Sequence, residues 1–197
     1  MRPTRLVLAS ANPGKIAEFQ SLLQEHVDEV VAQDELGVAA APEIHSTFVE
    51  NAIAKARHAS VASGGAALAD DSGICVAALG GRPGVRSARY APSGADGDNN
   101  QLLLEELADA ADRAAFYHCS LVMFRHPEDA APLVAEGQWH GVIGAEPRGE
   151  GGFGYDPLFV LPDGRTAAEL APADKNAASH RGLALARLLE MLERSQA

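Results

Sequence analysis

The sequence predicts a mixed α/β fold, and three observations lead to this class. Near the start, a short apolar strand is followed by a helix and then by a second strand. Further strand-like segments recur along the chain, and an amphipathic helix lies near its end. The later strands have no helices between them, which favours antiparallel neighbours. We therefore expect a sheet that contains both strand orientations and packs against helices.

The first elements carry clear local signals. Residues 5–9 form an apolar run, Asn12 is a good N-cap, and Pro13 suits the first helical position. A second strand is expected at 28–32. Thr47-Phe48-Val49-Glu50 has the form of a capping box, which predicts a helix that ends near Ala62. The apolar stripe of the first helix consists of Ile16, Phe19, Leu22, Leu23 and Val27.

The remaining elements follow from apolar runs and from glycine or proline clusters. Strands are expected at 66–71, 74–79, 114–125, 133–139 and 158–161, and helices at 99–108 and 179–194. Ser72-Gly73 is expected to separate the first two of these strands. Residues 80–97 contain several glycine and proline clusters, which predict a long surface loop. Loops of this length are often functional.

Composition limits the classes of function. The chain has 197 residues, 47% of them hydrophobic, so we expect a single domain over residues 1–197 with a full core. The net charge of -11 argues against a protein that coats nucleic acid. No run approaches the roughly 20 apolar residues of a membrane span, so we expect a soluble, cytoplasmic protein. Cys75 and Cys119 lie in apolar runs and are interpreted as reduced, buried structural residues.

Residues 10–15, Ser-Ala-Asn-Pro-Gly-Lys, stand where a strand meets the start of a helix. Backbone N–H groups and the helix dipole favour an anion at such a place. A lysine in the first helical turn opposes the dipole unless an anion lies nearby, so Lys15 indicates a phosphate ligand. The alternative is a solvated lysine beside a well-capped helix.

Asp70 and Asp71 follow an apolar run and precede Ser72-Gly73. Successive side chains of a strand point to opposite faces, so the two carboxylates should have different roles. A carboxylate at a strand end suits a magnesium ion that arrives with a polyphosphate, whereas a capped turn is the structural alternative.

The helix that begins after Thr47 presents Asn51 and Lys55 on one face, where Lys55 would reach a phosphate. Glu50 is interpreted as a helix cap, and Glu43, in the preceding loop, is the freer candidate metal ligand.

Two further segments carry candidate ligand-binding residues. In Gly149–Pro157, closely spaced glycines allow a ligand to approach the backbone and two aromatic residues would stack on a ring; on this segment alone, a turn that buries an aromatic is favoured. Lys175, His180 and Arg181 place potential cations around the start of the last helix. Together with the acidic residues, these cations indicate a phosphate and metal site in an acidic protein.

In order and spacing, these segments resemble the inosine triphosphate pyrophosphatase family of HAM1-like or RdgB-like proteins, which includes bacterial dITP/XTP pyrophosphatases. The resemblance runs nearly end to end. The motifs are Leu8–Lys15, Thr47–Ala52, Ala69–Gly73, Pro83–Tyr90, Gly152–Pro157 and Ser179–Gly182. Ala11 is a departure, because many bacterial members have glycine there.

The resemblance implies a long mixed sheet flanked by helices, two lobes with an active-site cleft between them, and a homodimer. It implies Mg²⁺ as cofactor, with Asp71 as a ligand and as the catalytic base. Glu43 remains the second candidate ligand from its place in the chain, and Lys15 and Lys55 are the candidate catalytic cations. The implied substrate-binding residues are Ser10, Ala11, Asn12, Pro13, Gly14, Lys15, Ser72, Phe153, Gly154, Tyr155, Asp156, Lys175, His180 and Arg181. We expect Lys15, Lys55, Asp71 and Arg181 to surround a single pocket.

The implied reaction is attack of water on the α-phosphorus of dITP, ITP or XTP, which releases pyrophosphate and cleanses the nucleotide pool. Asp71, beside magnesium, is expected to have a low pKa. Donors at the purine 6-oxo group would disfavour ATP, and GTP would have to be excluded at its 2-amino group. The competing hypotheses are a Maf-type nucleotide pyrophosphatase, a nucleotide-binding regulator without turnover, and a phosphatase that releases orthophosphate.

Overall fold

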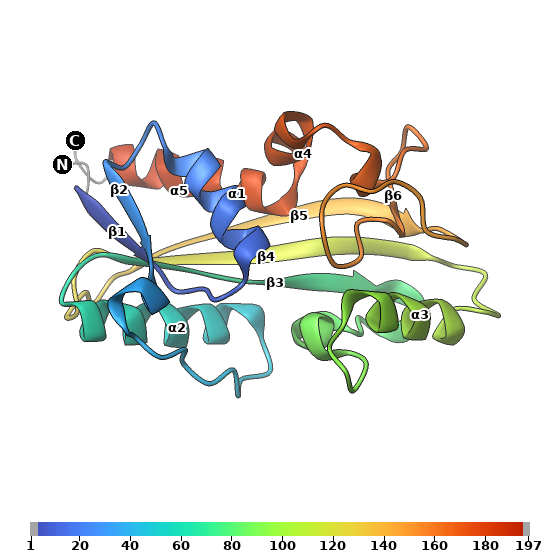
Figure 1. Ribbon diagram of the computed structural model, residues 1–197, viewed down its shortest axis with the longest axis horizontal. Helices are drawn as coiled ribbons and strands as arrows, with labels where there is room; N and C mark the ends of the chain where they lie inside the picture. Colours follow the sequence, from blue (N-terminus) through green and yellow to red (C-terminus); the bar gives the residue numbers. More distant parts are fainter. Residues whose placement is uncertain (1–3, 195–197) are drawn as a thin grey trace. The chain divides into compact units, whose positions relative to one another are not determined.

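The computed structural model describes residues 4–194 (Figure 1). Its strands are β1 (Arg5–Leu8), β2 (Glu29–Ala32), β3 (Ala67–Val76), β4 (Ala114–Phe124), β5 (Leu133–Ile143) and β6 (Phe159–Val160). Its α-helices are α1 (Pro13–Leu23), α2 (Phe48–Ser63), α3 (Asp96–Glu106), α4 (Pro172–Ala178) and α5 (His180–Arg194). Short 3₁₀ helices are η1 (Gln33–Leu36), η2 (Ala77–Leu79), η3 (Gly84–Arg89) and η4 (Ala167–Glu169).

The six strands form one sheet in the order β2-β1-β3-β4-β5-β6. Strand β1 pairs in parallel with β2 and with β3, whereas β5 and β6 are antiparallel. The predicted mixed sheet is therefore confirmed. Its parallel part has the strand, helix, strand order expected at the start of the chain.

The chain divides into two compact units. Unit 1 contains the described residues up to Asp71, then Cys119–Gly137, and the described residues from Arg181 onward. Unit 2 contains Ser72–His118 and Gln138–His180.

Unit 1 has a core on each face of its strands. Leu8 and Leu68 pack with residues of α1 and α5 on one face, while Val7 and Ala69 pack with alanines of α2 on the other. Figure 1 shows α1 and α5 on the opposite side of the strands from α2. This alternation follows from the two-residue period of a strand, and it decides where the polar residues farther along β3 point.

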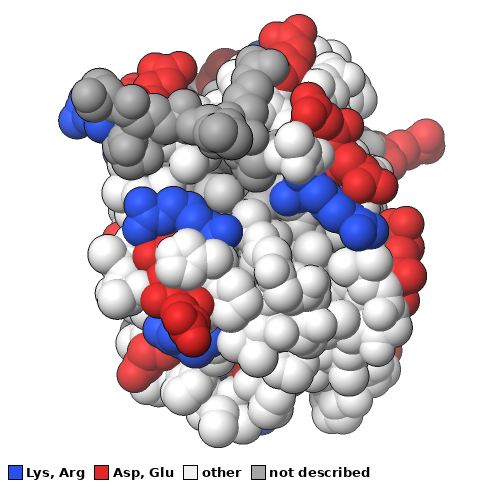
Figure 2. Space-filling view, turned by 90° about the vertical axis from the view of Figure 1, so that its left-hand side faces the viewer, with Lys and Arg blue, Asp and Glu red and all other residues white. Residues whose placement is uncertain are grey.

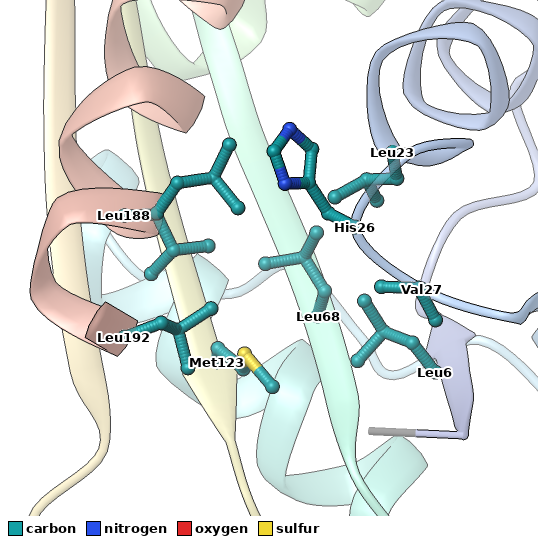
Figure 3. A pocket seen from close by; sticks show the side chains of 9 residues that line it. Leu6, Leu23, His26, Val27, Leu68, Met123, Leu188 and Leu192 are labelled. Carbon is teal, nitrogen blue, oxygen red and sulfur yellow. The ribbon is translucent and has the colours of Figure 1, made fainter. Parts of the chain in front are cut away.

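The core between β1, α1 and α5 contains a small, almost wholly apolar pocket (Figure 3). Aliphatic side chains and Met123 form most of its wall, and His26 is its one ring-bearing residue. The lining residues are Leu6, Leu23, His26, Val27, Leu68, Met123, Leu188, Leu189 and Leu192.

Unit 2 has a core that is rich in aromatic rings. Tyr117 lies 4.8 Å from Phe159 between ring centroids, and Trp139 lies 5.3 Å from Phe159. Leu103 of α3 and Leu107 just after it are fully buried in the same cluster. This core supports the glycine-rich segment before β6.

The predicted break between strands 66–71 and 74–79 is wrong. Residues 67–76 form the single strand β3, so Asp70 and Asp71 lie within a strand rather than at its end. A side chain at Gly73 would overlap the Gly84 carbonyl and Ser87. Ser87 Oγ instead accepts a hydrogen bond from Ile74 N at 2.9 Å, so glycine allows the following loop to pack against a continuous strand.

Other boundaries also differ from the predictions. Strand β5 continues to Ile143, the segment 80–97 contains η3, and the helix α4 precedes the predicted last helix. The first strand, the second helix and the last helix occur where they were predicted to within one residue. The first helix begins at Pro13 as predicted but ends at Leu23, so Val27, which was assigned to its apolar stripe, lies beyond it.

The surface carries mixed charge where it is visible in Figure 2. There, Lys and Arg side chains are separated by Asp, Glu and uncharged residues, so the described residues form no continuous basic patch on this face. Among residues 4–194, no helix combines the length and apolar character needed to cross a membrane.

Candidate active site

The loop before α1 folds around its own side chains. Asn12 caps the helix, because its Oδ1 accepts a hydrogen bond from Lys15 N at 3.1 Å, and Pro13 takes the first helical position. Ser10 Oγ accepts a hydrogen bond from Asn12 N at 3.2 Å. The predicted cap is confirmed, and these two contacts hold residues 10–15 in a defined turn.

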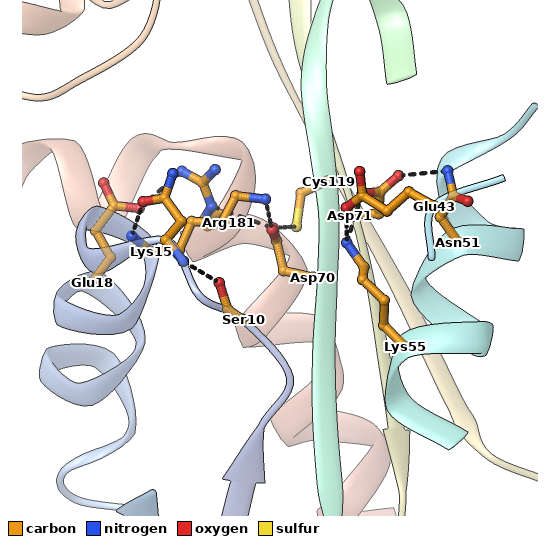
Figure 4. A network of polar contacts seen from close by, with 11 residues as sticks. Ser10, Lys15, Glu18, Glu43, Asn51, Lys55, Asp70, Asp71, Cys119 and Arg181 are labelled. Atoms are coloured by element: carbon orange, nitrogen blue, oxygen red, sulfur yellow. Dashed lines mark hydrogen bonds and ion pairs between the residues drawn. The ribbon is translucent and has the colours of Figure 1, made fainter. Parts of the chain in front are cut away.

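A first charged cluster lies beyond this turn, and we call it the Asp70 cluster. It consists of Lys15, Glu18, Asp70, Cys119 and Arg181 (Figure 4). Lys15 forms an ion pair with Asp70, and Arg181 Nε lies 3.3 Å from Asp70 Oδ2. Arg181 Nη1 also lies 2.9 Å from Glu18 Oε2, and Cys119 Sγ donates to Asp70 Oδ2 at 3.1 Å.

The Asp70 carboxylate is ionised although it is fully buried. Burial alone would raise its pKa, but the Lys15 and Arg181 cations hold that pKa well below its usual range. Lys15 and Arg181 both stand in the first turn of a helix, where a cation opposes the dipole. The sequence indicated a nearby anion at both positions, and Asp70 supplies one from the protein itself.

A second charged cluster, the Asp71 cluster, consists of Glu43, Asn51, Lys55 and Asp71. Lys55 Nζ lies 2.7 Å from Asp71 Oδ1 and 3.0 Å from Glu43 Oε1. Asn51 Nδ2 donates to Asp71 Oδ2 at 3.2 Å. Both Asn51 and Lys55 come from α2, which presents them on one face as their spacing predicted.

Burial raises the pKa of the Asp71 carboxyl above its usual value, and Lys55 offsets only part of this effect. The sequence predicted a low pKa for Asp71 beside magnesium. Without the metal, the protein raises this pKa, because the effect of burial exceeds that of the ion pair with Lys55. Burial would lower the pKa of Lys55, but Asp71, Asp70 and Glu43 together raise it.

The two clusters lie on opposite faces of β3 (Figure 4). The sequence predicted different roles for the two aspartates, and they do contact different cations. The expected single group of Lys15, Lys55, Asp71 and Arg181 is divided: Lys15 and Arg181 pair with Asp70, and Lys55 pairs with Asp71. The clusters still influence each other, because the charge of Lys15 lowers the pKa of Asp71.

The Asp71 cluster has the donor set that a magnesium ion prefers. Asp71 and Glu43 converge on one ammonium group, so their oxygens already surround a single positive charge. Within residues 4–194, no three His, Cys, Asp or Glu side chains form a group that would hold a metal by themselves. Two carboxylates are enough for Mg²⁺ when phosphate and water complete its shell. Glu50 lies outside this cluster: Thr47 is the N-cap of α2, its Oγ1 accepts a hydrogen bond from Glu50 N, and it donates to Glu50 Oε2 at 2.6 Å.

The charge balance of the two clusters also favours a metal. Three cations, Lys15, Lys55 and Arg181, face four carboxylates. A triphosphate would add further negative charge to this balance, and a divalent cation would offset it.

Unit 2 holds the second group of predicted residues around Asp156. The buried Asp156 carboxylate accepts hydrogen bonds from Phe153 N at 2.9 Å and from Tyr117 Oη at 3.2 Å, and it pairs with Lys175 Nζ at 2.8 Å. A side chain at Gly152 would overlap this carboxylate, so the turn requires glycine there. Asp156 thus fixes the conformation of residues 152–156 through contacts of its buried carboxylate.

Phe153 and Tyr155 have different environments. Lys175 Nζ lies 4.8 Å from the centroid of the half-buried Phe153 ring, a cation–π contact. Tyr155 is buried in the aromatic core, and its hydroxyl donates to Ser87 O at 2.8 Å. The alternative of a turn that buries an aromatic therefore describes Tyr155 and not Phe153.

The other predicted residues of unit 2 are also placed. His180 is buried and stacks on Tyr117, with centroids 4.6 Å apart and an angle of 6° between the rings. Ser72 is half-buried in β3. Gly154 is held on both sides by α3, because its N–H donates to Asp96 Oδ2 at 2.7 Å and its carbonyl accepts from Asn100 Nδ2 at 3.0 Å.

A sequence model of the Ham1 family matches residues 6–191. The chain belongs to the Ham1 family. It is 58% identical over 193 residues to a dITP/XTP pyrophosphatase of Ralstonia nicotianae, a match that covers 95% of this chain and 96% of the relative. A dITP/XTP pyrophosphatase of Burkholderia pseudomallei is 57% identical over 194 residues, covering 96% and 93% of the two chains.

A solved HAM1 protein from Coxiella burnetii has the same fold, with a TM-score of 0.88 and 49% identity. That match covers 96% of this chain and 98% of the other. The resemblance inferred from the motifs is therefore confirmed.

In this Ham1 protein the structure adds residues that the sequence did not single out. Glu18 joins the Asp70 cluster, and Asp96 and Asn100 hold Gly154. Asn51 was noticed only because it shares a helical face with Lys55, and that spacing was the available signal for its contact with Asp71.

Proposed function

We propose that this Ham1 protein hydrolyses dITP, ITP and XTP to the nucleoside monophosphate and pyrophosphate. The observation that carries the proposal is the convergence of Asp71 and Glu43 on one ammonium group, in a chain whose relatives are named dITP/XTP pyrophosphatases. Removal of these nucleotides would cleanse the nucleotide pool.

In this proposal, unit 1 binds the triphosphate and the metal. The turn of residues 10–15 contacts phosphate oxygens through its backbone, with Lys15 as the charged member. Asp71 and Glu43 would hold Mg²⁺, which, when bound, neutralises charge on the phosphates. Lys55 and Arg181 supply further positive charge as negative charge builds up during the reaction.

Asp71 is the proposed general base. It orients a water molecule for attack on the α-phosphorus and accepts the proton that this water loses. Its two oxygens are held by Lys55 and Asn51, so the carboxylate has a fixed orientation for this task. The bond from the α-phosphorus to the bridging oxygen breaks, and pyrophosphate leaves.

Unit 2 is proposed to bind the purine. Phe153 has a half-buried ring that would stack on the base, with Lys175 on that ring. The remaining proposed contacts are Ser72, Gly154, Tyr155, Asp156 and His180. Donors near the 6-oxo group would be left unpaired by adenine, so ATP is expected to be a poor substrate.

Product analysis with dITP and Mg²⁺ at mildly alkaline pH tests the proposal. We expect dIMP and pyrophosphate in equal amounts. Orthophosphate should appear only after addition of inorganic pyrophosphatase, and direct release of orthophosphate would contradict the reaction. A preference for pyrimidine or methylated nucleotides in a substrate panel would favour a Maf-type activity instead.

We further propose that the protein works as a homodimer in the cytoplasm, as the family resemblance implies. Sedimentation equilibrium of the purified protein measures the oligomeric state. A single species with the mass of one chain across micromolar concentrations would contradict the dimer.

A further inference from the structure

Asn51 has a buried carboxamide that contacts the proposed metal ligand Asp71 and the backbone of the loop that carries the other proposed ligand, Glu43. The residue is 1% exposed and lies in the first part of α2. Its Nδ2 donates to Asp71 Oδ2 at 3.2 Å and to His45 O at 3.3 Å, and its Oδ1 accepts from His45 N at 3.1 Å. His45 follows the proposed metal ligand Glu43 by two residues.

The orientation of this carboxamide is fixed by its partners. The His45 N–H can only donate, so the carboxamide oxygen must face it. The NH₂ group then faces His45 O and Asp71 Oδ2, and both of its hydrogens are used. A flipped carboxamide would place a donor against a donor and an oxygen against two oxygens.

The contact with Asn51 completes the support of Asp71. Lys55 binds Oδ1 of this carboxylate at 2.7 Å, and Asn51 binds Oδ2, so each oxygen has its own partner. Rotation of the carboxylate about its Cβ–Cγ bond would break both contacts. The same Asn51 side chain holds the loop that carries Glu43, through both polar groups of the His45 backbone.

We propose that Asn51 is a positioning residue for hydrolysis, which fixes the rotation of the Asp71 carboxylate and its spacing from Glu43. This inference rests on the proposed function, because it assigns those two carboxylates to the metal and to the attacking water. In this scheme Asn51 contacts neither the metal nor the attacking water. Replacing a residue that hydrogen-bonds to a metal ligand commonly lowers activity or metal affinity by about 10- to 100-fold.

The test combines steady-state kinetics of the full-length Asn51→Ala protein with dITP, at several Mg²⁺ concentrations, with calorimetric titration of Mg²⁺ into the same protein without nucleotide, where weaker binding than in the unaltered protein is expected. We expect kcat to fall about 10- to 100-fold and the Mg²⁺ concentration for half-maximal rate to rise. The KM for dITP at saturating Mg²⁺ should stay within about twofold, because residues 10–15 and unit 2 are unchanged. A variant that is folded but has unchanged kcat and Mg²⁺ dependence would overturn the inference.

A matched control separates orientation of Asp71 from general loosening of the loop. His58 lies on the same helix, and its Nε2 contacts Ala39 O of the same loop at 2.9 Å. His58→Ala should keep nearly normal kcat and Mg²⁺ dependence. If it loses as much as Asn51→Ala, general attachment of the loop explains the effect, and the inference that Asn51 acts by orienting the Asp71 carboxylate is overturned.

A second variant covers the case in which Asn51→Ala does not fold. Asn51→Asp has nearly the same volume and keeps the acceptor for His45 N, but it replaces the donor to Asp71 by an oxygen. We expect a similar loss of kcat, and normal turnover would overturn the inference. If the unaltered enzyme forms no pyrophosphate from dITP, the proposed function itself fails, independently of Asn51.

Discussion

The two groups of predicted site residues are built in different ways. Unit 1 uses buried charged side chains, with Asp70 and Asp71 pointing to opposite faces of one strand and each paired with its own cations. Unit 2 has one buried ion pair, Asp156 with Lys175, which supports a turn beside the half-buried Phe153 ring. The first arrangement suits charge stabilisation and proton transfer, while the second suits a flat, uncharged ring. Substitutions in unit 1 should therefore affect turnover and stability, and those in unit 2 should affect substrate affinity.

The largest effect is expected for Asp71→Asn. The amide keeps the volume but cannot accept the proton of the attacking water, so kcat for dITP should fall about 10²- to 10⁴-fold with a much smaller change in KM. Steady-state kinetics measures both constants. Glu50→Gln, at the exposed cap of α2, should leave kcat unchanged. Near-normal turnover of Asp71→Asn would contradict the assignment of the general base to unit 1.

Asp70→Asn should cause the largest loss of stability. It removes the anion that Lys15 and Arg181 share, and breaking a buried pair in this way typically costs about 3–5 kcal/mol. Urea unfolding measures the loss. Asp163→Asn, which alters an exposed pair with Arg165, should have little effect. Equal midpoints for the two variants would show that the Asp70 cluster does not stabilise unit 1.

The pH dependence of stability sharpens this prediction. The pKa of Asp70 is lower in the folded protein than in the unfolded chain, where it is about 3.9. Its contribution is therefore complete above about pH 4 and is lost as the pH falls toward the folded-state pKa. Below about pH 4, the urea midpoint of the unaltered protein should fall more steeply than that of Asp70→Asn. Parallel acid profiles would contradict the depressed pKa.

Phe153→Ala should weaken substrate binding without slowing the reaction. Stacking of a base on an aromatic side chain is worth about 1–3 kcal/mol, so KM for dITP should rise about tenfold while kcat is nearly kept. Inorganic tripolyphosphate lacks a base, so its inhibition constant should be the same for Phe153→Ala and the unaltered protein. Weaker inhibition in the variant would mean that Phe153 also affects the phosphate site.

The smallest effect is expected for Asp96→Ala. It removes the acceptor of Gly154 N–H, a hydrogen bond of about 1 kcal/mol, and should raise KM for dITP several-fold at unchanged kcat. Asp98→Ala is the matched control, because Asp98 lies in the same helical turn but binds Ser93. Equal changes in both variants would point to the charge at the start of α3 rather than to the position of Gly154.

The parts of the fold that the sequence predicted have local causes. Asn12-Pro13 and the Thr47 N-cap define helix starts through neighbouring residues alone. The continuity of β3 depends instead on the packing of Gly73 against a loop more than ten residues later in the chain. The helix α4 has only seven residues, too few to show an apolar stripe.

The candidate site shows the same limit. Residue type and spacing singled out Lys15, Lys55 and Asp71, and the period of a strand predicted opposite directions for the two aspartates. Which cation meets which carboxylate depends on tertiary packing, so the pairing of Lys15 with Asp70 was not predicted. Asn51 was on the correct face, but its contact with Asp71 requires knowledge of how α2 lies on the sheet.

The buried thiol of Cys119 offers a built-in reporter for the Asp70 cluster. Burial raises its pKa well above the usual value, so it would react with an alkylating reagent only when this part of unit 1 opens. The half-buried Cys75 provides an internal reference in the same molecule. The ratio of the two labelling rates would measure how often the cluster opens, and slower labelling of Cys119 with Mg²⁺ and a nucleotide present would reveal ligand-dependent closure.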